Sequence, residues 1–272
     1  MLRLTRTIRF NLNRDGAWKG SNGHAGGPAP SSLATHAEFE IACEGAPDPQ
    51  TGYLINIKDI DAAAKKVLYP PLAMAALKHQ NLDPVRTLTL LYPELGRAIA
   101  DRLSGRITSV RWNLTPHCSI EVRMPTESSA VALLRVRAEF AAAHRLHVPD
   151  LSDDENRALF GKCNHPSGHG HNYIVEPTVE VPTDGGKPPI TVAGLEQIID
   201  ETVLERFDHK HLNLDTEEFG PDGLNPSVEN IARVCYDLMR PRLADEHAVT
   251  LRSVTVWETD RTRCTYPAPS HQ

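Results

Sequence analysis

Three histidines and one cysteine, close together in the sequence, have the residue types of a metal site beside a reactive thiol. They are His144, Cys163, His169 and His171. Residues two apart on a strand point to the same face of a sheet, so His169 and His171 could bind one ion together. His144 lies in an earlier alternating segment and could arrive from a paired strand. Three histidines with an open fourth position are typical of a catalytic zinc, and the alternative is a histidine-rich loop exposed to water.

Two further groups downstream could take part in the same chemistry. Asp208 and His209 are adjacent in FDHKHLN, and a carboxylate beside an imidazole holds the tautomer and orientation of the ring. Glu258, in VTVWETD, ends an alternating segment, and its carboxylate could accept two parallel hydrogen bonds from an N–H pair. Taken alone, the first pair could be a solvated turn and Glu258 an exposed acid. Their combination with the histidines and Cys163 is what makes them candidates.

The composition limits the class of protein. The chain has 272 residues, of which 40% are hydrophobic and 24% charged, as in soluble globular proteins of one large or two ordinary domains. A formal net charge of -6 argues against a general nucleic-acid binder. Five cysteines at scattered spacings do not form a disulfide framework and favour a reducing compartment. No apolar run has the length of a membrane span, and the start, MLRLTRTIRF, lacks the apolar core of a signal peptide. We therefore expect a cytoplasmic protein with no membrane partner.

The elements that must position these residues occur twice along the chain. In the first half, the predicted elements are strands at 2–13 and 34–44, a helix at 57–67, a short helical segment at 72–77, a helix at 93–103, and two strands within 106–123. In the second half they are a strand at 133–146, a helical turn at 153–160, a strand at 169–181, helices at 192–206 and from 225–226 to 241, and strands at 251–258 and 262–266. Loops rich in Gly, Ser and Pro are predicted at 14–33 and 182–189, and a linker at 125–130. The fold class is therefore α+β, with a β-β-α-α-β-β plan repeated in domains 1–126 and 127–272.

The histidine set, the cysteine in GKCNHPSGHGH, the FDHKHLN segment and the strand end VTVWETD together closely resemble the 6-pyruvoyl-tetrahydropterin synthase family and its relative, 6-carboxy-tetrahydropterin synthase. The resemblance covers residues 135–267 strongly, and the first half only as a degenerate copy. It implies two tandem tunnelling-fold (T-fold) units. In that fold, three four-stranded antiparallel sheets close into a barrel and two barrels stack.

The resemblance also implies a role for each candidate residue. The implied roles are Zn²⁺ ligands for His144, His169 and His171, general base for Cys163, proton-transfer partners of that base for Asp208 and His209, pterin anchor for Glu258, and a hydroxyl near the pterin for Ser227. Each role has a physical basis. A Zn²⁺ ion bound to the side-chain oxygens of the substrate stabilises the negative charge that develops when a proton leaves carbon. A nearby Zn²⁺ and an imidazolium favour the thiolate form of a cysteine.

The implied activity is that of a carbon-oxygen lyase acting on phosphates. Five residues separate Cys163 from His169, a gap that resembles the pyruvoyl-forming enzymes of tetrahydrobiopterin synthesis, whereas the carboxy-forming enzymes of queuosine synthesis usually have a shorter one. This favours conversion of 7,8-dihydroneopterin triphosphate to 6-pyruvoyl-tetrahydropterin with loss of triphosphate. Cys163 also argues against the variants that carry Glu in its place. Two alternatives stay open: a 6-carboxy-tetrahydropterin synthase, and a non-catalytic pterin-binding regulatory protein.

The first half departs from the family pattern at every functional position. Arg14 stands for His144, Ala34–His36 for His169–His171, Ala76 and Leu77 for Asp208 and His209, and Leu114 for Glu258. We interpret this half as a degenerate, non-catalytic unit. One chain would supply two sheets, so three chains would supply the six needed for two stacked barrels. We therefore expect a homo-oligomer, a trimer of tandem chains, with sites between subunits. A triphosphate would require basic residues such as Lys162 or Arg145.

Overall fold

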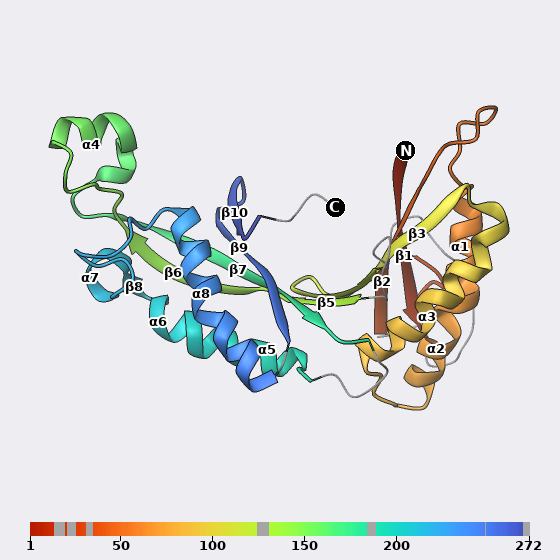
Figure 1. The fold of residues 1–272 in the computed structure, drawn as a ribbon. Coiled ribbons are helices and arrows are strands. Elements are labelled where there is room, and N and C mark those ends of the chain that lie inside the picture. Colours follow the sequence, from red (N-terminus) through yellow and green to blue (C-terminus); the bar gives the residue numbers. More distant parts are fainter. Residues whose placement is uncertain are drawn as a thin grey trace. The chain divides into compact units, whose positions relative to one another are not determined.

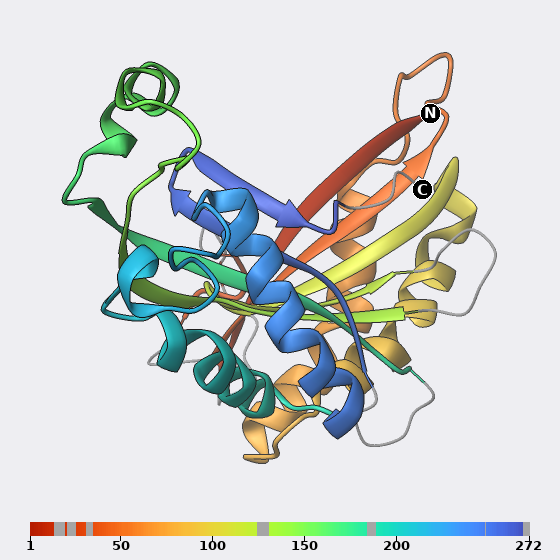
Figure 2. The same cartoon turned by 60° about the vertical axis from the view of Figure 1, so that its left-hand side comes forward.

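The chain forms two compact units in a computed structural model that describes residues 1–13, 20, 26–30, 35–123, 131–183, 189–247 and 249–268. The first unit comprises Met1–Leu134 and Val181–Pro188, and the second comprises Arg135–Glu180 and Pro189–Gln272. The chain is drawn from two directions in Figures 1 and 2. The expected linker at 125–130, with the expected domain boundary, lies outside the described residues, as does most of the expected loop at 14–33. No helix among the described residues is long and apolar enough to cross a membrane.

The first unit has an antiparallel sheet covered by helices. The sheet has the order β1-β2-β3-β4, formed by Leu2–Leu12, Thr35–Gly45, Gly105–Thr115 and Cys118–Arg123. Three helices connect β2 to β3 and lie on one side of the sheet in Figure 1: α1 (Ile57–Val67), α2 (Tyr69–Leu77) and α3 (Pro84–Ile99), the last followed by a 3₁₀ turn, η1 (Ala100–Arg102). Side chains along each strand point alternately to the two faces of the sheet, and Phe10, Phe39 and Trp112 are buried. The aromatic rings of Phe39 and Trp112 lie 5.2 Å apart.

The helix expected at 93–103 was placed wrongly. α3 begins at Pro84, where Asp83 caps it by accepting a hydrogen bond from the backbone N–H of Arg86 at 2.7 Å. Pro84 suits a first helical turn, because its missing N–H would have no partner there anyway. Pro93, which the sequence suggested as a starting point, lies inside the helix.

The second unit has a five-stranded sheet with the order β10-β9-β7-β6-β8. Its strands are β6 (Ala138–His144), β7 (His169–Val181), β8 (Lys210–His211), β9 (Thr250–Thr259) and β10 (Thr262–Tyr266). All pairs are antiparallel except β6 and β8. The strand expected at 133–146 is two strands, because Arg137 interrupts it between β5 (Val131–Val136) and β6. β5 crosses the division between the two units.

Helical segments connect the strands of the second unit. Between β6 and β7 lie α4 (Asp153–Phe160) and a 3₁₀ turn, η2 (Gly161–Asn164). Between β7 and β9 lie α5 (Val192–Ile199), a π-helical turn, η3 (Asp200–Leu204), α6 (Glu205–Phe207), α7 (Leu212–Asp215) and α8 (Val228–His247). Helix α8 packs along the sheet against β9 and β10 (Figures 1 and 2). The sequence placed both ends of α8 wrongly: it starts after Ser227, and it continues through Pro241.

A cluster of aromatic side chains fills the core of the second unit. The rings of Phe140 and Tyr173 stack with centroids 5.1 Å apart, and Phe207 lies 6.3 Å from Phe140. Phe219 lies 5.7 Å from Phe207, and each of the four side chains is at most 1% exposed. Phe140 and Tyr173 face each other across β6 and β7, so this cluster holds the two strands in register.

Replacing Phe140 with alanine should destabilise the protein strongly. The buried ring leaves a cavity, so the free energy of unfolding should fall by roughly 3–5 kcal/mol. Leu159→Ala is the control, because the Leu159 side chain is 64% exposed and its loss should change stability by less than about 0.5 kcal/mol. Denaturant titration of both variants measures the difference. Equal effects at the two positions would contradict the assignment of Phe140 to the core.

Candidate functional site

The structure brings His144, His169 and His171 together at one end of the second unit's sheet. In the antiparallel pairing of β6 with β7, His144 lies opposite His169, and Ala142 lies opposite His171. Opposite residues share a face of the sheet, so the three imidazoles meet. One ring nitrogen from each histidine lies within 4.8 Å of the others, and the Nε2 atoms of His144 and His169 are 3.1 Å apart. In the described parts of the chain, this is the one cluster of three ligand side chains that could hold a metal ion.

His144 is held in the orientation that a ligand needs. Its Nδ1 donates a hydrogen bond to the carbonyl oxygen of Pro226 at 2.7 Å, which leaves the lone pair of Nε2 facing the other two rings. The side chain is 0% exposed, and burial lowers the pKa of His144 to about 4. Burial also lowers the pKa of His169. Both rings are therefore neutral at pH 7, which is the form that binds a metal.

An unpaired ring nitrogen fits a bound cation. The Nε2 atom of His171 is buried and has no hydrogen-bond partner among the described residues. A buried polar atom without a partner costs free energy, and a metal ion would supply the missing partner of a nitrogen lone pair. The donor set therefore fits a metal.

Glu258 lies beside the histidine cluster. It belongs to β9, the neighbour of β7, and its Oε1 atom lies 3.6 Å from Nε2 of His144 and 3.9 Å from Nε2 of His171. Its side chain is 21% exposed, so the carboxylate borders both the cluster and solvent.

The structure adds Tyr173, which the sequence did not single out. Tyr173 is fully buried, its ring lies 5.6 Å from that of His171, and its hydroxyl has no hydrogen-bond partner among the described residues. Burial raises the pKa of Tyr173, and the nearby carboxylate of Glu258 raises it further. Its position two residues after His171, on the same face of β7, was the signal that could have identified it.

Cys163 lies in the turn η2, and its backbone is tied to the chain beyond β6. The carbonyl oxygen of Cys163 accepts a hydrogen bond from the backbone N–H of Leu146 at 2.9 Å. Leu146 follows His144 by two residues, so the cysteine loop is anchored close to the metal-ligand cluster. The Cys163 side chain is half-buried.

Asp208 and His209 form the expected pair. His209 Nδ1 lies 2.9 Å from Asp208 Oδ2, and Asp208 also accepts a hydrogen bond from the backbone N–H of Ala141 at 2.8 Å. The Ala141 bond and, after it, the His209 contact lower the pKa of Asp208. His209 has φ of 57°, a left-handed conformation that is uncommon outside glycine, and its side chain is 83% exposed.

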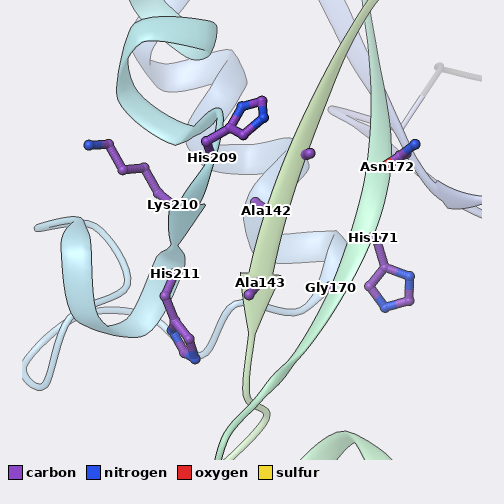
Figure 3. A pocket seen from close by; sticks show the side chains of 9 residues that line it. Ala142, Ala143, Gly170, His171, Asn172, His209, Lys210 and His211 are labelled. Atoms are coloured by element: carbon purple, nitrogen blue, oxygen red, sulfur yellow. The ribbon is translucent and has the colours of Figure 1, made fainter.

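This pair lies on the other side of β6 from the cluster. β7 and β8 flank β6 at opposite edges, and Figure 3 shows His209 and Lys210 on the side of β6 away from His171. Two strand spacings amount to about 10 Å. Among the described residues, no hydrogen bond or ion pair joins Asp208 or His209 to the histidine cluster or to Cys163. His171 and His209 both line the open pocket of Figure 3, but within the described residues they enter it from opposite edges of β6 and do not contact each other through a hydrogen bond or ion pair.

Ser227 lies near the cluster but is engaged in capping a helix. Its Oγ atom accepts a hydrogen bond from the backbone N–H of Asn230 at 3.4 Å, in the first turn of α8. It directly follows Pro226, whose carbonyl oxygen orients His144. The start of α8 thus contributes to the cluster through its backbone.

Part of the chain matches a known protein family. Residues 133–269 match the family model described as 6-pyruvoyl tetrahydropterin synthase. A Drosophila melanogaster protein named 6-pyruvoyl tetrahydrobiopterin synthase is 39% identical over 140 residues, which is 51% of this chain and 81% of that protein. The Homo sapiens protein of the same name is 37% identical over 131 residues, 48% of this chain and 87% of that protein. A solved structure of Caenorhabditis elegans 6-pyruvoyl tetrahydropterin synthase aligns with a TM-score of 0.45 and 32% identity, covering 54% of this chain and 99% of that one.

The metal-free protein should lose stability in mild acid because of His144. Since the pKa is about 4 in the folded chain and 6.5 ordinarily, the unfolded chain binds more protons between these values. The stabilisation is fully present above pH 6.5 and is lost as the pH falls toward 4, by at most roughly 3 kcal/mol. Denaturant titrations after chelation should give a lower free energy of unfolding at pH 4.5 than at pH 7, both in the wild type and in the exposed control His117→Gln. In His144→Gln, the difference in the free energy of unfolding between the two pH values should be smaller. An unchanged difference would contradict the assignment of this acid sensitivity to His144.

Proposed function

The chain belongs to the 6-pyruvoyl tetrahydropterin synthase family, and from this premise we propose that its second unit converts 7,8-dihydroneopterin triphosphate to 6-pyruvoyl-tetrahydropterin. The reaction type is that of a lyase, with loss of triphosphate from the substrate side chain. The observation that carries the proposal is the convergence of His144, His169 and His171, with Glu258 beside them, in the matched region.

We propose Zn²⁺ as the ion that the three histidines hold. Three neutral imidazoles and an open position are typical of catalytic zinc sites. Such an ion would bind the side-chain oxygens of the substrate and stabilise the charge that develops there as a proton leaves carbon. The hydrogen bond from His144 to Pro226 fixes the ring and its tautomer, as outer partners of metal-bound histidines generally do.

The proposed base is the thiolate of Cys163. It takes a proton from the hydroxyl-bearing carbon next to the ring, and the electron pair passes into the ring, so that this carbon becomes a carbonyl and the dihydropterin, after protonation, becomes a tetrahydropterin. It also takes a proton from the next hydroxyl-bearing carbon, whose electron pair expels triphosphate from the neighbouring carbon, and the enol that is left becomes the second carbonyl. The support for Cys163 as the base is the anchoring of its loop at Leu146, close to the cluster. Tyr173 is fully buried, and its ring lies 5.6 Å from that of His171, one of the proposed ligands.

Glu258 and Ser227 are proposed as contacts of the pterin. The Glu258 carboxylate could accept a parallel pair of hydrogen bonds from the N–H groups of the ring. No arginine or lysine of the described residues pairs with it, and its two close contacts are histidines, so its oxygens are available. Ser227 keeps a hydroxyl hydrogen to donate, since its Oγ only accepts in capping α8.

We propose that Asp208 and His209 serve the site of a neighbouring copy. The pair is exposed and lies across β6 from the histidines of its own chain, so a second copy is the simplest source of the proton-transfer partner. His209 then exchanges the proton carried by Cys163, and Asp208 holds the imidazole in place.

The first unit is proposed to be a degenerate, structural copy of the second. Both units run strand, strand, helices, strand, strand, and both sheets are antiparallel through these four strands. The strand registers offer a second way to compare the units: Phe10 lies opposite Ala37, and Phe140 lies opposite Tyr173. If the two phenylalanines correspond, Thr35 rather than His36 takes the place of His171.

An assembly of three chains follows from this proposal. The sheets of the first units would close one barrel and those of the second units another, with the second barrel carrying the sites. The product and the alternatives are tested together by incubating the protein with dihydroneopterin triphosphate. Release of triphosphate with 6-pyruvoyl-tetrahydropterin supports the proposal, a carboxy product would identify the 6-carboxy-tetrahydropterin synthase, and binding without turnover at full zinc content would identify a regulatory pterin-binding protein.

Cys163→Ala should abolish turnover without releasing the metal. Loss of a general base typically costs roughly 10²–10⁴-fold in rate. The zinc content, measured by elemental analysis, should stay that of the wild type because the histidines are untouched. Cys264→Ala, a second half-buried cysteine in the same unit, is the matched control and should keep its activity. Full activity in Cys163→Ala would exclude this thiol as the base.

Mixed assemblies should show that each site draws on two copies. In the proposed mechanism, the Cys163→Ala and His209→Ala variants are each inactive. When equal amounts of the two are dissociated and reassembled together, about a quarter of the sites should combine an intact Cys163 with an intact His209. The mixture should therefore recover about a quarter of the wild-type rate. Cys163→Ala mixed with His171→Ala is the control and should restore nothing, since both residues belong to the same copy's part of the site. No recovery in the first mixture would contradict sharing between copies.

A further inference from the structure

The loop that carries Cys163 is bound to the end of β6 by the residue that follows the cysteine. Asn164 is only 5% exposed, and its Nδ2 atom donates to the carbonyl oxygen of Leu146 at 2.6 Å and to Nδ1 of His147 at 3.1 Å. The backbone N–H of Leu146 in turn donates to the carbonyl oxygen of Cys163. Both polar backbone groups of Leu146 are thus bound to the Cys163–Asn164 pair.

A second asparagine fixes the neighbouring residue. Asn213 brackets the backbone of Arg145: the N–H of Arg145 donates to Oδ1 of Asn213 at 2.7 Å, and Nδ2 of Asn213 donates to the carbonyl oxygen of Arg145 at 3.0 Å. Asn213 lies in α7, which follows the Asp208–His209 pair and β8. The backbone of Arg145 is therefore held by a segment distant in sequence.

Arg145 connects the two asparagines. Its guanidinium donates from Nε to the carbonyl oxygen of Asn164 at 3.2 Å and from Nη2 to Oδ1 of Asn164 at 3.4 Å. Arg145 also directly follows His144. Two of its five guanidinium N–H donors are therefore bound to the cysteine loop.

These bonds replace the regular secondary structure that the loop lacks. Only a short 3₁₀ turn contains Cys163, and a single hydrogen bond contributes about 1 kcal/mol net, so the position of the thiol depends on several bonds acting together. A base must reach its proton within hydrogen-bond distance, and a displacement of about 1 Å costs roughly 10²-fold in rate.

We propose that Asn164 and Asn213 are positioning residues for Cys163, acting together through Arg145. The inference rests on the proposed function, in which the Cys163 thiol is the base. Among the described residues, neither asparagine forms a hydrogen bond with His144, His169, His171 or Glu258. The shared connection through Arg145 means that losing either asparagine loosens the same loop.

The rate measurements use Asn164→Ala, Asn213→Ala and the double variant in the zinc-loaded full chain. Each single variant should lower kcat for dihydroneopterin triphosphate by roughly 10–100-fold, with KM within about threefold and zinc content unchanged. Because both residues act through one connection, the double variant should lose much less than the product of the two single losses. Losses that multiply, or single variants with wild-type kcat, would overturn the proposal.

A matched control separates positioning from general stability. Asn156 is 0% exposed and brackets the backbone of Val148 in the same way, accepting from its N–H at 2.8 Å and donating to its carbonyl at 2.9 Å, but it bonds to neither Arg145 nor the cysteine loop. Asn156→Ala should lower the melting temperature while kcat stays within about threefold of wild type. A kcat loss equal to that of Asn213→Ala would mean that any buried asparagine in this region matters, and would overturn the assignment.

The amide hydrogen exchange of Leu146 tests the same bonds without a substrate. Its N–H should exchange at least about tenfold faster in Asn164→Ala and Asn213→Ala than in the wild type or in Asn156→Ala. If a variant to alanine does not fold, the isosteric Asn164→Asp and Asn213→Asp keep the acceptor and lose the donor, and serve in its place. If the exchange rate of the Leu146 N–H is unchanged in the folded variants, the inference is overturned. If the wild type shows no turnover but the variants exchange faster, only the proposed function is refuted.

Discussion

The register between β6 and β7 is the constraint on which the site depends. A slip of one residue would turn the side chains of a strand to the other face of the sheet, and the three imidazoles would no longer meet. The stacked pair Phe140–Tyr173 fixes this register from the core, four residues along the strands from the pair His144–His169. Burial against this aromatic core also keeps His144 neutral, and the carbonyl of Pro226 turns its ring, so packing and ligand chemistry come from the same strands.

The site is divided between two edges of one strand. The metal ligands lie toward β7, while the Asp208–His209 pair lies at the β8 edge, where its imidazole is exposed. A division of this kind makes association of copies a requirement of the proposed chemistry. In the proposed assembly, the short segment from Lys210 to Asp215 has two tasks. It follows the pair that we propose to serve another copy, and through Asn213 it holds the backbone of Arg145.

Much of the fold could be predicted from the sequence, because the strands alternate clearly and β7 begins and ends where its pattern does. The limits of α3 and α8 could not be predicted, because proline is unfavourable in a helix interior. Only the folded structure shows that Pro93 and Pro241 lie inside these two helices. The His169–His171 spacing predicted a shared face correctly. The bonds of Asn213 to Arg145 had no signal in the sequence, because they join segments far apart along the chain, and the separation of His209 from the histidines depends on strand order rather than on any local pattern.

A crystal structure of the zinc-loaded protein, with anomalous data collected at the zinc edge, is the most direct test of a metal site completed by a second copy. We expect one anomalous peak per chain in the second unit, about 2.0–2.1 Å from a nitrogen of each of His144, His169 and His171. We also expect the Asp208–His209 pair nearest to Cys163 to belong to another copy. A peak bound by other residues, or a pair supplied by the same chain, would contradict the account.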